Sequence, residues 1–252
     1  MDIKVLHFNL GVMYHTGQGV PQDYAQAVKW YRLAADQGIA QAQFHLGLMY
    51  YFGEGVPKDD VQAVKWYRLA ADQGDADAQS TLGYMYHTGQ GVPQDDVQAV
   101  KWYRLAADQG DADAQNNLGG MYYFGKGVDQ DYAQAVKWYR LAADQGIAQA
   151  QSTLGLMYDF GKGVSQDDVE AAKWYRLAAD QGHVSAQFNL GVMYANGQGV
   201  RRNYVQAEKW YSLATDQGYA DGAKLRDLAV KQMTPQQIAQ AQELARNWKS
   251  KQ

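Results

Sequence analysis

The sequence predicts an all-α solenoid built from six helix–turn–helix repeats, followed by C-terminal capping helices. Three observations support this fold class. Tryptophans recur every 36 residues, at Trp30, Trp66, Trp102, Trp138, Trp174 and Trp210. Glycines recur at fixed places in each repeat, and the alternation of β-branched and polar residues that indicates strands is absent. A fixed period of this length indicates a solenoid, in which each repeat buries its apolar face against the next one.

The first helix of each repeat is predicted from apolar residues on one side. In the second repeat, Ala42, Leu46, Met49 and Tyr50 share one face of a helix with 3.6 residues per turn. Gly53 then suits the left-handed position that ends a helix. The apolar face is therefore expected to pack against neighbouring helices.

The second helix of the same repeat begins after a short connection. Asp59 or Asp60 is expected to cap its N-terminus through the carboxylate. Its apolar face includes Trp66 and Tyr67, and Gly74 ends it. Small residues on these faces allow close helix packing, while the aromatic rings fill the wider gaps.

The domain organisation follows from this period. We expect one continuous solenoid domain, with repeats over 1–218 and capping helices over 219–252. The approximate repeat boundaries are 3–38, 39–74, 75–110, 111–146, 147–182 and 183–218. In the cap, Thr234 is a candidate N-cap, with Pro235 at the first helical position and Gln237 completing a capping box. The expected apolar face of that helix comprises Ile238, Ala241, Leu244, Ala245 and Trp248.

Long identical segments bear on the origin of the chain. Residues 23–43 are identical to 131–151, and residues 59–79 are identical to 95–115. This identity indicates recent duplication or deliberate consensus design, and both interpretations remain open.

The repeated pattern A-x-A-Q-x-x-L-G-x-M-Y-x-x-G-x-G-V-x-x-D-x-x-x-A-x-K-W-Y-x-x-A-A-x-Q-G resembles the Sel-1-like repeat, a relative of the tetratricopeptide repeat. The resemblance extends over residues 6–218. It implies a right-handed superhelix whose first helices line the concave side, and an adaptor role in binding other proteins, often in bacteria. Bacterial relatives imply virulence, signalling or toxin-immunity roles.

The positions that differ between repeats cluster on the first helices, opposite the constant packing face. Aromatic residues with asparagine and histidine make a plausible protein-binding surface, because rigid amphipathic rings dominate binding hot spots. The candidate partner-binding residues are Phe44, His45, Tyr51, Tyr84, His87, Asn117, Tyr123, Asp159, Phe188 and Asn189. The competing interpretation is that part of this face, Phe44, Leu48 and Phe52 above all, packs against adjacent first helices.

Composition argues against several classes of protein. The net charge of −4 disfavours a general nucleic-acid binder or a protein held on anionic lipid by charge. The chain has no cysteine, so disulfides and thiolate metal sites are excluded. No apolar run approaches a membrane span, and the start lacks the features of a signal peptide. The expected location is the cytoplasm if the chain is complete, and the periplasm or exterior if a signal peptide has been removed.

The chemical motifs are weak, and we predict no catalytic, cofactor or metal site. The GKG sequences at 125–127 and 161–163 follow helices, so we interpret them as turns and not as phosphate loops. Asp75 with Asp77 suits a helix N-terminus better than a calcium loop. Arg68 can pair with Asp72 on a solvated face.

The leading functional hypothesis is a non-enzymatic scaffold that binds a protein or peptide in the groove formed by the first helices. The alternative is a consensus-like or recently duplicated repeat protein without a dedicated partner. A hydrolase is disfavoured, because the penicillin-binding relatives of this family are cysteine-rich. Leu6, Phe8 and Leu10 open the chain without a preceding cap, so we also expect weak self-association at this end.

Overall fold

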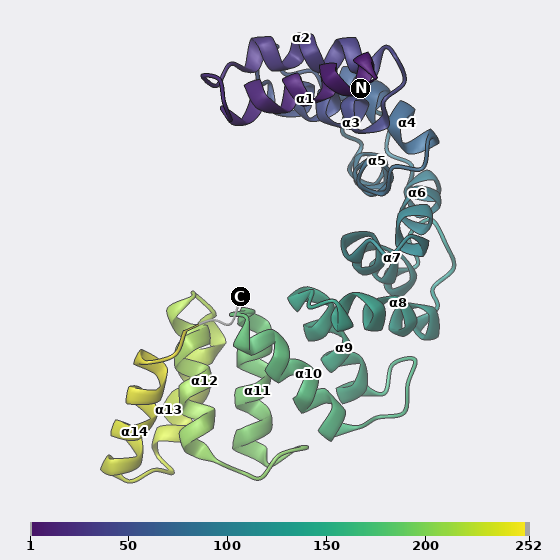
Figure 1. The fold of residues 1–252 in the computed structure, drawn as a ribbon. Helices are drawn as coiled ribbons and strands as arrows, with labels where there is room; N and C mark the ends of the chain where they lie inside the picture. The colour runs from purple at the N-terminus through teal and green to yellow at the C-terminus, as the bar shows by residue number, and fades with distance from the viewer. Residues whose placement is uncertain (1, 250–252) are drawn as a thin grey trace. The chain divides into compact units, whose positions relative to one another are not determined.

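The computed structural model describes residues 2–249, and within that range it contains fourteen helices and no strand (Figure 1). The helices are α1 (Ile3–Thr16), α2 (Tyr24–Ala35), α3 (Ala40–Phe52), α4 (Asp60–Asp72), α5 (Ala76–Thr88), α6 (Asp96–Asp108), α7 (Ala112–Phe124), α8 (Tyr132–Asp144), α9 (Ala148–Phe160), α10 (Asp168–Asp180), α11 (Val184–Asn196), α12 (Tyr204–Asp216), α13 (Ala220–Val230) and α14 (Pro235–Arg246). They form two compact units, Met1–Gln130 with α1–α7 and Asp131–Gln252 with α8–α14. The predicted all-α solenoid is confirmed. None of the helices in the described range is long and apolar enough to cross a membrane.

The predicted helix ends are present, and the structure decides between the two candidate caps of α4. The side chain of Asp59 accepts a hydrogen bond from the backbone N–H of Gln62 at 3.0 Å, while Asp60 lies in the first turn. Gly53 ends α3 in the left-handed region, with φ of 75°. Asp75 caps α5 by accepting from the backbone N–H of Ala78 at 2.9 Å.

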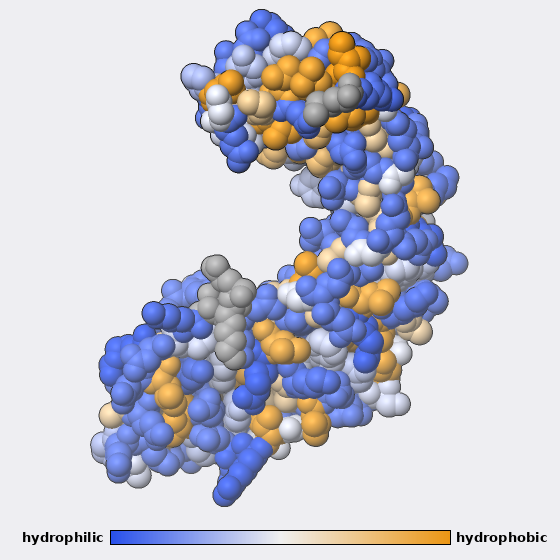
Figure 2. Space-filling model, viewed as in Figure 1, coloured by the Kyte–Doolittle hydropathy of each residue, from blue (hydrophilic) through white to orange (hydrophobic). Residues whose placement is uncertain are grey.

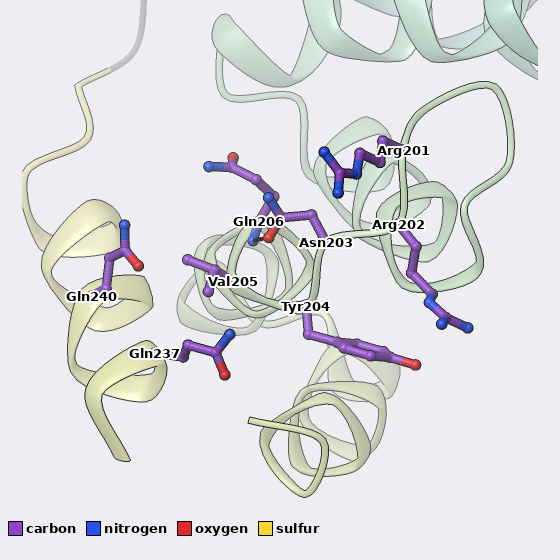
Figure 3. A pocket seen from close by; sticks show the side chains of 8 residues that line it. All are labelled: Arg201, Arg202, Asn203, Tyr204, Val205, Gln206, Gln237 and Gln240. Atoms are coloured by element: carbon purple, nitrogen blue, oxygen red, sulfur yellow. Dashed lines mark hydrogen bonds between the residues drawn. The ribbon is translucent and has the colours of Figure 1, made fainter. Parts of the chain in front are cut away.

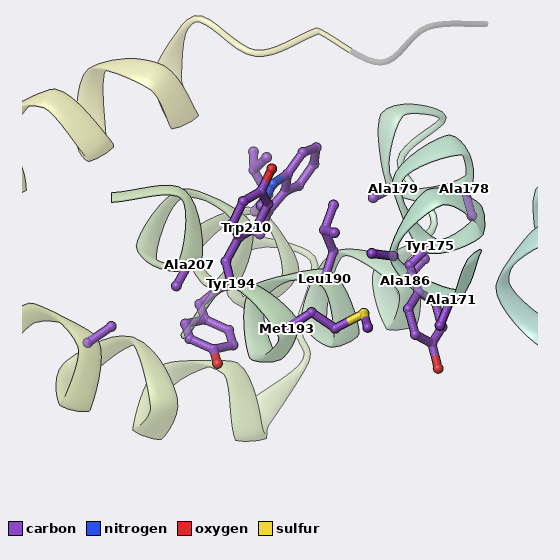
Figure 4. Packing of buried hydrophobic residues seen from close by; sticks show 14 residues of the cluster. Ala171, Tyr175, Ala178, Ala179, Ala186, Leu190, Met193, Tyr194, Ala207 and Trp210 are labelled. Atoms are coloured by element: carbon purple, nitrogen blue, oxygen red, sulfur yellow. The ribbon is translucent and has the colours of Figure 1, made fainter. Parts of the chain in front are cut away.

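Within each repeat the two helices pack closely because a glycine faces a tyrosine ring. A Cβ atom at Gly47 would lie 2.6 Å from Cε1 of Tyr67, which is closer than side chains approach one another. The Tyr67 side chain is fully buried, together with Ala42 and Leu46 of the same repeat. The predicted packing faces therefore form the core, and Figure 4 shows the corresponding cluster in the second unit.

The tryptophans connect successive repeats instead of filling the centre of their own. Trp66 packs on the buried cluster formed by α2 and α3, and Trp102 packs on the cluster formed by α4 and α5. Trp66 and Trp102 are half-buried, whereas Trp174 and Trp210 are buried. Tryptophan at this position therefore packs on a cluster that spans the boundary between two repeats.

Two hydrogen-bonded links between repeats were not predicted. The buried amide of Gln43 donates to the carbonyl of Ala35 in the preceding repeat at 3.1 Å, and its oxygen accepts from Gln73, at the end of the second helix of its own repeat, at 2.7 Å. Gln79, Gln151 and Gln187 repeat this arrangement.

The second link corrects the expectation that Arg68 pairs with Asp72. Arg68 donates instead to the hydroxyl of Tyr86 in the next repeat, and its guanidinium lies 5.6 Å from the centre of that ring. Arg32, Arg104, Arg140 and Arg176 each make the equivalent contact with a tyrosine of the following repeat. A tyrosine one repeat away outcompetes the carboxylate on the same helix, because the planar guanidinium both stacks on the ring and donates to its hydroxyl.

The C-terminal segment ends the solenoid as two helices. The capping box is present, with Thr234 and Gln237 bonding reciprocally around Pro235. Ala241 is buried, and Ile238, Ala245 and Trp248 are half-buried, whereas Leu244 is exposed. The apolar face of α14 is therefore narrower than predicted, and it packs against α12.

At the other end, α1 exposes apolar side chains. Ile3, Val5 and Leu6 are exposed, while Phe8 and Leu10 are half-buried. Figure 2 shows apolar surface gathered at the α1–α2 end of the first unit. Self-association through this end remains a proposal.

Candidate partner-binding surface

The candidate residues lie on the first helices of both units. Seven are in the first unit, and Asp159, Phe188 and Asn189 are in the second. The seven are Phe44, His45 and Tyr51 on α3, Tyr84 and His87 on α5, and Asn117 and Tyr123 on α7. Tyr84 is exposed and the other nine are half-buried, whereas the constant residues beside them are buried. The structure therefore groups these residues by unit.

Phe44 and His45 belong to a cluster of rings on α1, α2 and α3. The His45 ring stacks on Tyr31, with centroids 5.2 Å apart and an interplanar angle of 10°. Phe8 and Phe44 contact the same imidazole at 5.7 and 5.8 Å. Burial is the main cause that lowers the pKa of His45, and the nearby His15 adds to it, while Asp75 opposes it. The neutral imidazole is thus part of an aromatic surface.

Tyr51 lies in a polar chain that joins two repeats. Its hydroxyl is 3.4 Å from Oε1 of Gln90, and the amide of Gln90 donates to Oδ2 of Asp60 at 3.2 Å. The ammonium of Lys58 lies 5.3 Å from the centre of the Tyr51 ring, and Phe52 contacts its edge at 5.0 Å. Phe52 itself is exposed and does not pack between first helices as the competing interpretation expected.

Tyr84 and His87 lie one turn apart on α5. Tyr84 is 45% exposed, although Met85 next to it is fully buried. Nδ1 of His87 lies 2.6 Å from Oδ1 of Asp96, so the imidazole is oriented by a carboxylate on the second helix. A fixed imidazole beside an exposed phenol ring can make both hydrogen bonds and apolar contacts with a ligand.

On α7, Asn117 and Tyr123 are half-buried. The Tyr123 ring meets Phe124 edge-on at 4.9 Å, which repeats the contact of Tyr51 with Phe52. Beside Asn117, the side-chain oxygen of Asn116 is buried and has no hydrogen-bond partner.

In the second unit, Asp159 and Asn189 lie near the hydroxyl of Tyr175. The Tyr175 hydroxyl is 3.4 Å from Oδ2 of Asp159. Burial raises the pKa of Asp159, the negative charge of Asp168 raises it further, and the bond to Tyr175 opposes this rise. The pKa of Tyr175 is raised by burial and by Asp159, whereas its hydrogen bond to Asn189 lowers it.

Phe188 contacts Tyr211 and Tyr219, with ring centroids 5.9 and 4.7 Å apart. It is a packed ring of the terminal repeat that keeps part of its surface exposed.

Acidic residues of the second helices were missed by the sequence reasoning. Asp60, Asp96 and Asp168 occupy the first turns of α4, α6 and α10, next to the tyrosine hydroxyls and the variable residues. The sequence did contain a sign of this: the position that holds aspartate in these repeats holds Tyr24, Tyr132 and Tyr204 in the others. The position varies between repeats, as a binding position does, yet it lies outside the first helix.

The chemistry of this surface is that of recognition. It offers aromatic rings, carboxylates, amides and an oriented imidazole. Within residues 2–249, no three histidine, aspartate or glutamate side chains gather closely enough to hold a metal ion.

Comparisons with known proteins identify the repeat. The Sel1 repeat model matches residues 6–39, 40–75, 76–111, 112–147, 148–183 and 184–219. A Sel1 repeat protein from Oxalobacter formigenes has 39% identity and a TM-score of 0.77, over 89% of this chain and 65% of that one. This chain thus spans just under two thirds of the length of that protein.

Two further solved structures are similar at lower identity. A protective antigen of uropathogenic Escherichia coli with an SLR fold is 29% identical, covering 97% of this chain and 84% of that one, with a TM-score of 0.44. Immunity protein Pa5087 from Pseudomonas aeruginosa is 21% identical, covering 86% and 82%, with a TM-score of 0.46. No curated protein sequence matches significantly. Because the six matched repeats account for most of its length, the chain belongs to the Sel1 repeat family.

Proposed function

We propose that this protein is a non-enzymatic scaffold that binds a segment of a partner protein on the variable surface of α3, α5 and α7. Sel1 repeat proteins generally mediate protein–protein interactions, and this general role is expected of a member of the family. The proposed binding surface rests on the exposure of Tyr84 on α5. Its side chain is 45% exposed, although the adjacent residues Gly83 and Met85 are buried. A large ring left exposed on an otherwise well-packed helix is typical of a binding anchor.

The chemistry of the surface indicates what the partner presents. Tyr51, Tyr84 and Tyr123 supply rings, while Asp60 and Asp96 supply carboxylates beside them. A partner segment with apolar side chains next to lysine or arginine would complement both features. The preformed helices keep the ordering cost of binding low.

The alternative of a repeat protein without a dedicated partner rests on the identical segments. Those segments, 59–79 and 95–115, cover the second helices and the start of the next first helices. They leave out the positions of Tyr84, His87 and Tyr123, which differ between repeats. Identity in packing residues therefore does not argue against a specific partner.

The test combines stability with binding. Wild-type protein and the variants Tyr51→Ala, Tyr84→Ala and Tyr123→Ala are immobilised, and the proteins retained from a bacterial lysate are compared by mass spectrometry. Thr88→Ala, an exposed change at the end of α5, is the matched control. A true hot-spot tyrosine costs about 2 kcal/mol in binding, which is roughly a thirtyfold loss of affinity.

The expected result is a protein retained by wild type and by the Thr88 variant but lost with Tyr84→Ala, while the melting temperature of the Tyr84 variant hardly changes. If all three variants melt earlier yet keep their affinity in the folded fraction, the tyrosines are packing residues and the proposal is rejected.

A further inference from the structure

The second helices carry a periodic apolar stripe that is separate from the surface proposed above. It consists of the residues at positions i, i+4 and i+8, which in α4 are Val61, Lys65 and Leu69. The same stripe occurs as Val97, Lys101 and Leu105 in α6, as Val169, Lys173 and Leu177 in α10, and as Val205, Lys209 and Leu213 in α12. We call it the outer stripe. Residues with this spacing share one helix face.

In three of these helices the outer stripe is exposed. Leu69, Leu105 and Leu177 are 46%, 48% and 42% exposed, and the valines of α4, α6 and α10 are exposed as well. In α12 the same stripe is covered: Leu213 is only 8% exposed, and Val205 and Lys209 are half-buried.

The cover on α12 is α14. Each of α4, α6 and α10 is followed by a first helix, as α12 is followed by α13, and their leucines stay exposed, so α13 does not explain the difference. α14 packs on α12, and Gln237 and Gln240 of its first turns lie beside Val205 and Gln206 (Figure 3). Trp248, just beyond the end of α14, contacts Trp210, with centroids 6.5 Å apart.

The contact side of α14 shows which side chains pack on the outer stripe of α12. It is centred on Ala241, which is fully buried, with Ile238 and Ala245 half-buried on either side. Small side chains at the centre let two helices approach closely, and the flanking glutamines remain in water.

On α4 the outer stripe borders a groove of about 460 Å³. Val61, Val64 and Leu69 line it from α4, and Gly91 and Val92 line it from the connection after α5. Lys65, Arg68 and Asp72 also line this groove, so its charged side chains carry a net positive charge.

We propose that the outer stripe of α4 is a second docking surface, which receives an amphipathic helix of a partner protein that presents an alanine-centred face as α14 does to α12. The outer stripes of α6 in the same unit and of α10 in the second unit are equivalent sites, each taken by itself. A glutamate on that helix opposite Lys65 completes the fit, because an exposed lysine in the middle of an apolar stripe favours an acidic neighbour. The outer stripe contains no first-helix residue, so a test of this proposal is separate from a test of the function proposed above.

The experiment uses α14 itself as the probe. A fluorescein-labelled peptide of residues 233–249 is titrated with full-length protein, and binding is followed by anisotropy. The test variant carries Leu69→Lys, Leu105→Lys and Leu177→Lys. The control carries Phe52→Lys, Phe124→Lys and Phe160→Lys, because these rings are equally exposed, at 63%, 65% and 67%, but lie at the ends of first helices.

We expect saturable binding to wild type, at least tenfold weaker binding to the leucine variant, and binding to the phenylalanine variant within about twofold of wild type. Circular dichroism confirms that both variants stay folded, since every changed side chain is exposed. No saturation up to about 1 mM protein overturns the proposal. Equal binding to the leucine variant also overturns it, because the peptide would then be exchanging with the protein's own α14. Sedimentation that shows a dimer of wild type, lost in the leucine variant, would assign the stripe to a second copy of the chain and likewise overturn the proposed partner.

Discussion

Replacing Glu208 with valine is expected to stabilise the second unit. Glu208 lies on α12 and is only 2% exposed, although the equivalent residues are Val28, Val64, Val100 and Val136 in other repeats. Its Oε1 accepts a hydrogen bond from Ser212 at 3.0 Å, while its Oε2 is buried without a partner. The side chain thus places a carboxylate where the repeat normally has a methyl-bearing group of similar volume.

The size of the expected stabilisation follows from the cost of the unpaired oxygen and the gain from the one hydrogen bond of the carboxylate. A buried polar atom without a partner costs about 1–3 kcal/mol, and one hydrogen bond, to Ser212, returns about 1 kcal/mol. Arg226 favours the charged form but makes no hydrogen bond to it, so its compensation is partial. We expect Glu208→Val to raise the free energy of unfolding by about 1–2 kcal/mol near pH 7.

The gain should depend on pH. Burial raises the pKa of Glu208 in the folded state above its value in the unfolded chain, with Asp216 adding to it and Ser212 and Arg226 opposing it. A raised pKa means that the folded state binds the proton more tightly. The contribution of this group to stability is therefore greatest below the unfolded pKa of about 4.3 and is lost as the pH rises through the folded value. The advantage of the valine variant should grow from pH 4 to pH 8.

The assay is urea unfolding at several pH values, with hydrogen exchange of the α12 and α14 amides to localise the change. Ser212→Ala serves as the second arm of a double-mutant cycle: it should destabilise wild type and be nearly neutral beside Glu208→Val. A valine variant that unfolds earlier than wild type, or a stability gap that stays constant across this pH range, would refute the reasoning.

Three further expectations concern the links between repeats. Trp102→Ala should cost about 3 kcal/mol and Arg104→Ala about 1 kcal/mol, because the indole packs on a buried cluster while the guanidinium makes one bond to a tyrosine; equal urea midpoints would contradict this. Gln79→Leu should cost about 2 kcal/mol, since it loses the bond to Ala71 of the preceding repeat and the bond from Gln109 of its own repeat, and unchanged thermal unfolding would contradict it. Gly91→Ala should destabilise more than Gly74→Ala: both have positive φ, but only at Gly91 would a Cβ collide with a backbone carbonyl; calorimetry of the pair checks the order.

Much of the fold could be predicted because each helix is specified locally. The apolar stripe of Ala42, Leu46 and Met49, the cap at Asp59 and the ending glycine at Gly53 are all readable over a few residues. The capping box at Thr234 was predictable for the same reason, since its partners are three residues apart. Six copies of one pattern then leave a solenoid as the consistent arrangement.

The side-chain links between helices could not be predicted, because their partners are 18 or 30 residues apart. Arg68 has a carboxylate four residues away, and sequence spacing alone favoured that pairing over Tyr86. Gln43 and Gln73 look like ordinary surface residues until the backbone brings them together. In the candidate site, the varying residues of the first helices were readable, whereas Asp60 was taken only as a possible cap, and its place beside Tyr51 depends on the pairing of helices.

The constant residues stabilise the contacts between helices, whereas the variable residues form the proposed binding surface. The constant links join neighbouring helices: Arg68 bonds Tyr86 and Gln43 bonds Ala35 across repeat boundaries, and Gln73 bonds Gln43 within one repeat. Trp66 packs on the cluster formed by α2 and α3. Stability in such a chain is a sum of nearest-neighbour terms, so a change at one link acts locally. Exposed side chains such as Tyr84 and the leucines of the outer stripe contribute little to those terms, whereas the variable residues His45 and Phe188 also pack on neighbouring rings. The exposed positions of the first helices are therefore free to differ between repeats without loss of the fold, which is the physical condition for a scaffold whose binding residues change while its framework does not.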